Sequence, residues 1–322
     1  MKKLILLLAI CCTALGMTSV HAQSSEQPTP SVWAWEVSSK SRTIYLLGEL
    51  HYFIGVAGMN ISHELGKDIY ELSNKVWTET QQIIPDNPPS ANKISQQVTA
   101  ETWNKIEPAV KGVIDHFRNK PTSEKEFLLR RFMNEFNRND PITAYANLGI
   151  VSSFKLQRDR PDFLSYSGLI ATLNQLEKQN SRRKLSELEK NTTISDMWWK
   201  HCDTKEKAEV MITAGLQKLD PSYAFENDLS KNIQTIFLRS GSDLTDIMNA
   251  HLSIDEGPVL LECTVTPRNH AWLPRLLEAL ESSGPPISFL VGIGHIGGEE
   301  GLLALLKANG HTNIKRIFSV KQ

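Results

Sequence analysis

An apolar stretch that ends in Gly-x-x-His occurs twice in this chain, once near each end. The first reads LLGELH, residues 46–51, and the second reads LVGIGH, residues 290–295. Each apolar run is typical of a buried β-strand, and the glycine allows a sharp turn at the end of the strand. Open α/β sheets bind their ligands at the carboxyl ends of strands. The repeated motif therefore predicts an α/β protein in which His51 and His295 meet at one edge of the sheet.

The second motif also has the spacing G-x-G-x-x-G of a dinucleotide-binding turn, at Gly292, Gly294 and Gly297. A dinucleotide site needs an acidic residue about 20 residues further on and a second nucleotide-binding half. No Asp or Glu follows Glu300, and the remaining residues complete only one strand–helix–strand unit. A dinucleotide site is therefore excluded. We interpret Gly297 and its neighbour Gly298 as making room for a ligand of the histidine.

Periodicity along the rest of the chain predicts a mixed sheet and a helical middle. Strands are expected at 32–38, 43–50, 75–80, within 181–189, at 287–294 and at 314–320. Helices are expected at 62–74, 269–281 and 299–309. Residues 94–156 and 192–255 are expected to be mostly helical. Residues 259–265 fit either a short strand or a helix end. The fold class is therefore α/β, with a mixed central sheet formed by strands from both chain ends and a large helical insertion at about 94–255.

The N-terminus has the pattern of a secretory signal peptide. Residues 1–22 begin with two lysines, continue through an apolar run and end in the small-residue sequence Val20-His21-Ala22. Cleavage there predicts export across the inner membrane to the periplasm. Residues 23–31 are polar and contain proline, which predicts a flexible lead-in, and residues 32–322 are expected to form a single domain. No later segment offers the ~20 apolar residues of a transmembrane helix.

Charge and cysteine content limit the partners and the covalent structure. The formal net charge is −1, and losing Lys2 and Lys3 with the signal peptide would lower it to −3. Without a basic block, neither nucleic acid nor an anionic membrane surface is an expected partner, and a peptide or small-molecule substrate is. Only Cys202 and Cys263 remain in the exported chain. They either form one disulfide or remain two buried thiols.

Five segments resemble, in order, the TraB/GumN family, which is related to the Tiki metalloproteases and more distantly to erythromycin-esterase-like and ChaN-like proteins. They read WAWEVSSKSRTIYLLGELH, VWTET, RRKLSELE, RNHAWL and VGIGHIGGEEGLLALLKANG. The C-terminal block is the most specific of them. The resemblance spans nearly all of the exported chain, although the helical middle is similar only in its general pattern.

This resemblance implies a metal site. Its expected metal ligands are His51, Glu79 and His295, and its further matching positions are Glu189, Arg268 and Asn269. The family usually has a small or apolar residue where this chain has Glu49, which would add a carboxylate to the site or place one in solvent. Imidazole nitrogen and carboxylate oxygen are ligands for Mn, Co or Zn, and a bound ion would lower the pKa of water to ~7.

The implied activity is that of an exported metal-dependent hydrolase acting on peptide or amide bonds. Glu189 or Glu49 would serve as general base or further ligand, and Arg268 would stabilise a developing oxyanion. No H-E-x-x-H or G-x-S-x-G motif is present, so neither a thermolysin-like nor a typical serine-hydrolase template applies. The alternative is a non-catalytic periplasmic protein of the same fold that binds a metal, haem or a peptide.

Each site residue also has a structural interpretation. Glu79 lies two residues after Trp77 and would equally suit the surface of an edge strand, and Glu189 would suit a surface ion pair. Arg268 would equally cap its helix or pair with Glu262.

Overall fold

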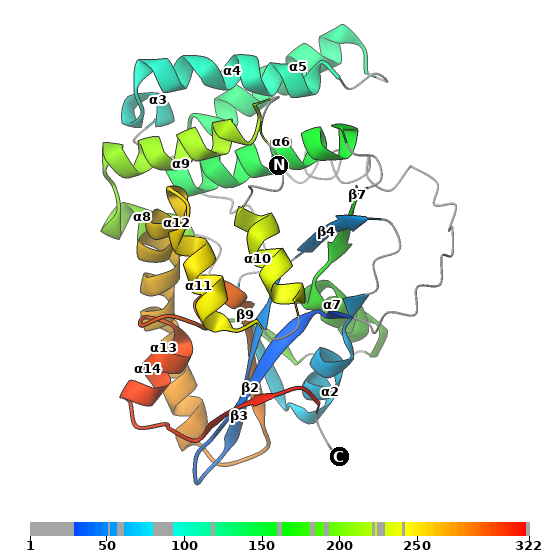
Figure 1. The fold of residues 1–322 in the computed structure, drawn as a ribbon, viewed down its shortest axis with the longest axis vertical. Coiled ribbons are helices and arrows are strands. Elements are labelled where there is room, and N and C mark those ends of the chain that lie inside the picture. The colour runs from blue at the N-terminus through cyan, green and yellow to red at the C-terminus, as the bar shows by residue number, and fades with distance from the viewer. Residues whose placement is uncertain are drawn as a thin grey trace.

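The fold is an α/β structure built around a mixed sheet. A computed structural model of the chain describes residues 29–50, 52–56, 61–79, 93–116, 120–159, 163–180, 184–189, 193–220, 223, 229–239 and 242–319. The largest sheet has the strand order β10-β2-β3-β9-β6-β8 (Figure 1). Its strands are β2 Val32–Ser38, β3 Thr43–Glu49, β6 Lys75–Thr78, β8 Leu185–Glu187, β9 Ile287–Gly292 and β10 Ile314–Ile317. Strands from both chain ends thus form its centre, as the sequence predicts.

Both faces of this sheet are buried, because its strands carry apolar residues on both sides. In β2, Trp33 and Trp35 enter one core and Val32 and Ala34 enter the other, as expected from alternation along a strand. The helices on the first face are α10 Leu229–Leu238, α11 Leu244–Leu252, α13 Thr266–Glu281 and α14 Leu302–Ala308. Those on the second are α2 Glu64–Leu72 and α7 Leu169–Asn180.

The middle of the chain is mostly helical, as predicted. Its helices are α3 Ile94–Gln97, α4 Ala100–Ile114, α5 Thr122–Phe136, α6 Pro141–Asp159, α8 Thr193–His201 and α9 Lys205–Gln217. Helices α4, α5, α6 and α9 share a separate core that includes Ile106, Leu148 and Ile212. They form a layer beyond one end of the sheet (Figure 1).

Two short strand pairs were not predicted. Strand β4, Tyr52–Val56, pairs antiparallel with β7, Phe163–Ser167. Strand β1, Thr29–Pro30, pairs parallel with β5, Ile61–Ser62. The end of the expected flexible lead-in, residues 23–31, is therefore a strand, held further by a 2.7 Å hydrogen bond from the Ser31 N–H to the Ser62 carbonyl. The expected signal peptide lies outside the described residues.

Residues 259–265 are helical, which decides between the two alternatives for this segment. Helix α12, Glu256–Leu260, continues through a π-helical turn, Leu261–Val265, directly into α13. Helix α13 therefore begins earlier than the predicted residue 269. Pro267 lies at the start of α13, directly after the π-helical turn.

Cys202 and Cys263 form a disulfide with a Cα–Cα distance of 5.7 Å. The bond joins the end of α8 to the π-helical turn. Both cysteines are buried in a small core with Trp198, which is itself fully buried and therefore a packing residue.

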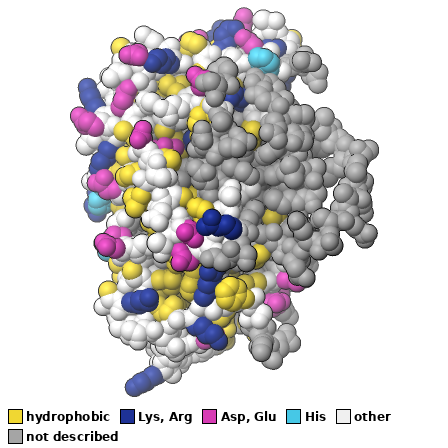
Figure 2. Space-filling view, in the orientation of Figure 1, with side chains coloured by type: hydrophobic (Ala, Val, Ile, Leu, Met, Phe, Trp, Pro, Cys, Tyr) yellow, Lys and Arg dark blue, Asp and Glu magenta, His cyan; other side chains and the backbone are white. Residues whose placement is uncertain are grey.

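Within the described residues, no helix is both long enough and apolar enough to cross a bilayer. On the face shown in Figure 2, basic and acidic side chains of the described residues are interspersed. The described part of this face therefore shows no concentrated surface of one charge.

The disulfide generates a prediction about stability. Replacing Cys202 and Cys263 by serine should lower the free energy of unfolding by about 4 kcal/mol, because the loop of 61 residues is no longer closed in the unfolded chain. Urea unfolding of the wild type with and without reductant measures the same difference in the free energy of unfolding. A midpoint that does not change with reductant, or a non-reduced digest without a linked Cys202–Cys263 peptide, would contradict the disulfide.

Candidate functional site

Four parallel strands end at the same edge of the sheet. Strands β3, β9, β6 and β8 are neighbours in this order, and each adjacent pair is parallel. A predicted site residue stands at each strand end: Glu49 closes β3, Glu79 follows β6, Glu189 follows β8 and His295 follows β9. Open α/β sheets bind ligands at this edge. The remaining predicted ligand, His51, lies outside the described residues.

The two Gly-x-x-His motifs contact one another at this edge. A Cβ atom added to Gly48 of the first motif would lie 2.5 Å from Cδ1 of Ile293 and 3.0 Å from Cγ1 of Ile296. A packed interior has no room for contacts that short. Only a glycine at this position therefore lets the second motif pack so closely on β3.

Hydrogen bonds fix the protonation state of His295, which is 4% exposed. Its Nε2 lies 3.1 Å from Nη1 of Arg268, and this ring nitrogen must accept because a guanidinium only donates. The proton is therefore on Nδ1, which donates to Oδ1 of Asn269 at 2.8 Å. The Asn269 amide in turn donates to the carbonyls of His295 and Glu300, at 3.1 and 2.8 Å. A neutral imidazole oriented in this way is the form that binds metal ions.

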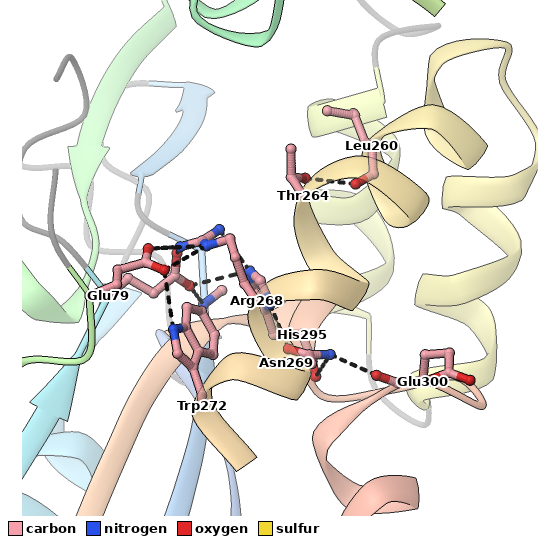
Figure 3. Close-up of polar contacts among 10 residues, drawn as sticks. Glu79, Leu260, Thr264, Arg268, Asn269, Trp272, His295 and Glu300 are labelled. Atoms are coloured by element: carbon pink, nitrogen blue, oxygen red, sulfur yellow. Dashed lines mark hydrogen bonds and ion pairs between the residues drawn. The ribbon is translucent and has the colours of Figure 1, made fainter. Parts of the chain in front are cut away.

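Arg268 lies at the centre of the site, among side chains that point toward it (Figure 3). It extends from the first turn of α13 and is 5% exposed. Its Nη2 donates to Oε2 of Glu79 at 2.6 Å and to Oε1 of Glu189 at 2.5 Å. Its Nε lies 3.0 and 3.1 Å from the two oxygens of Glu189. The guanidinium therefore joins the ends of β6 and β8 to the histidine that follows β9.

Burial and opposite charge compete in setting the protonation of this cluster. Burial raises the pKa of Glu189, while the adjacent Arg268 opposes that rise. Burial alone would lower the pKa of Arg268, but Glu79 and Glu189 outweigh it and raise the pKa, so the guanidinium stays charged. The side chains of Glu79 and Glu189 are 11% and 3% exposed. Neither is a surface acid, and Glu262, the other candidate partner of Arg268, pairs with Lys207 at 2.8 Å.

Trp272 is a site residue that the sequence analysis missed. Its Nε1 donates to Oε2 of Glu189 at 3.1 Å, and its ring lies 4.6 Å from the His295 ring and 4.7 Å from Cζ of Arg268. The signal that identifies it is its spacing, because residues i and i+4 of a helix share a face. Trp272 follows Arg268 by four residues in the segment RNHAWL.

The donors beside Arg268 fit a divalent metal ion. Imidazole nitrogen and carboxylate oxygen bind such ions at about 2.1 Å, so two ligands of one tetrahedral ion lie ~3.4 Å apart. Nε2 of His295 and Oε1 of Glu79 are 3.7 Å apart. Oε1 of Glu79 also accepts from the Gly292 N–H, which holds it beside β9. Two of the three expected ligands are thus close enough to share an ion.

A second group of metal-binding residue types does not make a site. Ligand atoms of Cys202, Glu262 and Cys263 lie within 4.8 Å of one another. The two sulfurs are bonded to each other and cannot act as thiolate ligands.

Glu49 lies on the opposite face of the sheet from Glu79. Alternation puts Glu49 on the same face as Leu47, which packs in the core beside α7. Its Oε2 accepts from the Ile170 N–H at 3.2 Å, in the first turn of α7. A carboxylate is favourable at this position because a helix N-terminus carries partial positive charge. These contacts place Glu49 at the N-terminus of α7, on the face of the sheet away from Glu79.

The glycines of the second motif accommodate helix α11, not the ligand that the sequence analysis expected. Added Cβ atoms would lie 3.0 Å from α11 side chains: His251 at Gly294, Leu244 at Gly297 and Met248 at Gly298. The three side chains follow one another at helical spacing and form one face of α11. Helix α11 therefore covers the turn that carries His295.

His251, the last of these α11 side chains, is a buried imidazole. It is 8% exposed, and its Nδ1 has no hydrogen-bond partner in the described part of the chain. Burial lowers its pKa to about 4, so the ring is neutral at neutral pH.

The contact at Gly48 predicts opposite effects of two glycine substitutions. Gly48→Ala should lower the free energy of unfolding by about 1–3 kcal/mol, because Ile293 and Ile296 must move. Gly112→Ala is the matched control, since nothing lies within 4 Å of its Cβ position in α4. It should raise stability by about 0.5–1 kcal/mol, as expected for a helical glycine. Urea unfolding measures both, and equal effects would exclude the close packing.

His251 predicts a loss of stability in acid. Its folded pKa lies below the ordinary value of 6.5, so the unfolded chain takes up a proton first as the pH falls. Stability present above pH 6.5 is therefore lost between about pH 6.5 and 4, by up to about 3 kcal/mol. His251→Gln should remove this part of the pH dependence, measured by urea unfolding at each pH. The exposed His270→Gln should keep it, and parallel curves for the wild type and His251→Gln would contradict the assignment.

The sequence matches the TraB/PrgY/gumN family over residues 33–313, from β2 to just before β10. The matched region contains the whole cluster around Arg268. No curated protein and no solved structure matches the chain. Because the family match covers most of the sequence, and the sheet, strand ends and histidine turn agree with the resemblance noted above, this chain belongs to the TraB/PrgY/gumN family.

Proposed function

We propose that this protein is an exported hydrolase that uses a divalent metal ion to cleave peptide or amide bonds. The observation that carries the proposal is a neutral His295 whose Nε2 lies 3.7 Å from Oε1 of Glu79 at the ends of adjacent parallel strands. The proposed ligands are His51, Glu79 and His295, and the candidate ions are Mn, Co and Zn. When bound, such an ion supplies Lewis acidity and activates water at neutral pH.

The other side chains of the site orient the histidine and hold the arginine in place. Asn269 holds the proton of His295 on Nδ1 and leaves Nε2 as the acceptor. Glu189 and Trp272 hold Arg268, which keeps its proton and can stabilise negative charge on a substrate carbonyl oxygen. Both oxygens of Glu189 already accept hydrogen bonds, from Arg268 and from Trp272. We therefore assign Glu189 to positioning Arg268 and not to the role of general base.

A periplasmic binding protein without turnover is the second candidate. The observation in its favour is that Glu79 and Glu189 both already bond to Arg268. Capture of a metal, haem or a peptide would need no carboxylate to take up a proton, whereas hydrolysis requires a general base.

Metal analysis and peptide cleavage test the proposal. Wild-type protein purified without a His-tag should contain, or acquire on titration, one equivalent of Mn, Co or Zn and should cleave members of a peptide library. His295→Ala, His51→Ala and Glu79→Gln should each abolish metal retention and cleavage, because each removes a ligand. His270→Ala is the matched control, since this exposed histidine contacts only Glu300 among the described contacts, at 2.7 Å.

The outcomes separate the candidates. Metal binding with no cleavage would favour the binding protein. A wild type that neither contains nor acquires a stoichiometric ion would reject both metal-based functions. Equal loss of cleavage in His270→Ala would show that the effect of the other variants is not specific to the site.

A further inference from the structure

We propose that Arg268 occupies the cation position of this site and sets its metal affinity, because the guanidinium and a divalent ion compete for Nε2 of His295 and for the negative charge of the Glu79 carboxylate. The inference rests on the proposed metal site and deepens it. It concerns a residue that would oppose metal binding, in addition to any role in holding substrate.

The competition follows from the atoms that Arg268 contacts. Its Nη1 lies 3.1 Å from Nε2 of His295, and its Nη2 lies 2.6 Å from Oε2 of Glu79. An imidazole nitrogen has one lone pair, so Nε2 cannot accept from the guanidinium and bind an ion at the same time. A metal ion on His295 therefore requires Nη1 to leave.

The charge of the site explains why a guanidinium is stable there. Glu79 and Glu189 bring two carboxylates into a place where their side chains are almost fully buried. Buried carboxylates without a nearby cation are strongly destabilising, so the metal-free protein needs a positive charge at this position. Arg268 supplies it.

Glu189 can keep the guanidinium bound after its hydrogen bonds to Glu79 and His295 are broken. Nε of Arg268 lies 3.0 and 3.1 Å from the two Glu189 oxygens, and these bonds do not involve Nη1. Trp272 holds Glu189 independently through Nε1, at 3.1 Å. Because the guanidinium is planar and rigid, Nη1 leaves His295 only when the whole group tilts, and the bonds from Nε to Glu189 can hold the group during that tilt.

Removing the guanidinium should strengthen metal binding and weaken the metal-free protein. We would titrate Mn²⁺ and Zn²⁺ into chelator-treated wild type, Arg268→Gln and Arg268→Lys by calorimetry, and measure Tm with and without each ion. Arg268→Gln should bind at least tenfold more tightly than the wild type. Its metal-free Tm should be several degrees lower, and each ion should raise its Tm by more. Arg268→Lys, which keeps the charge but not the fork of N–H groups, should fall between them.

Arg275→Gln is the matched control. Arg275 lies on the same helix and stacks on Trp77, with Cζ 4.0 Å from the ring centroid. Its loss removes one positive charge from α13 but leaves the contacts of Arg268 intact. Arg275→Gln should therefore bind each ion with wild-type affinity.

The results distinguish this inference from the proposed function. Tighter binding by Arg268→Gln, including binding where the wild type binds nothing, supports the competition. Wild-type binding that Arg268→Gln leaves unchanged or weakens overturns the inference and leaves the metal site standing. Absence of binding to every variant removes both. If Arg268→Gln does not fold, Arg268→Lys decides by the same comparison with Arg275→Gln.

Discussion

Parallel hydrogen bonding among β3, β9, β6 and β8 is the constraint on which the rest of the structure depends. The register pairs Glu49 with Gly292 and Leu290 with Thr78, so these strands end side by side. Residues that follow them emerge at one edge, although they come from distant parts of the chain. Helix α13 packs over that edge and brings Arg268 to the same position.

The charged side chains at this edge, Glu79, Glu189 and Arg268, depend on one another for their stability. Each carboxylate there would be costly to bury alone, and each is acceptable because a positive charge lies beside it. The Glu79 side chain also bonds to the Gly292 N–H and so links β6 to the turn that carries His295. The chemistry of the site and the cohesion of the sheet edge therefore rest on the same few side chains.

Local patterns predicted most of the fold. Each strand of the large sheet lies within a segment that the sequence predicts as a strand, because most of these segments are short apolar or alternating runs. His295 is predicted by its place after such a strand together with the family resemblance, and Glu79 by the resemblance alone. The pairing of β4 with β7 could not be predicted, because it depends on a tertiary contact between segments that are far apart in sequence.

Several contacts at the site could not be predicted for the same reason. Two glycines after His295 suggested an approaching ligand, but the partner is α11, which no local pattern connects to this turn. The strand ending at Glu49 was predicted, while the helix terminus that its carboxylate contacts depends on packing across the sheet. The disulfide stayed undecided for a similar reason, since sequence spacing does not give the distance between two cysteines.

The pairing of β3 with β9 has a consequence for biosynthesis. It joins residues 44–49 to residues 287–292, so the centre of the sheet needs a strand that is made much later than its partner. The local helices of the middle can form early, but the N-terminal strands must wait for that partner. Synthesis of residues 287–295 thus sets the earliest point at which Glu79 and His295 can come together.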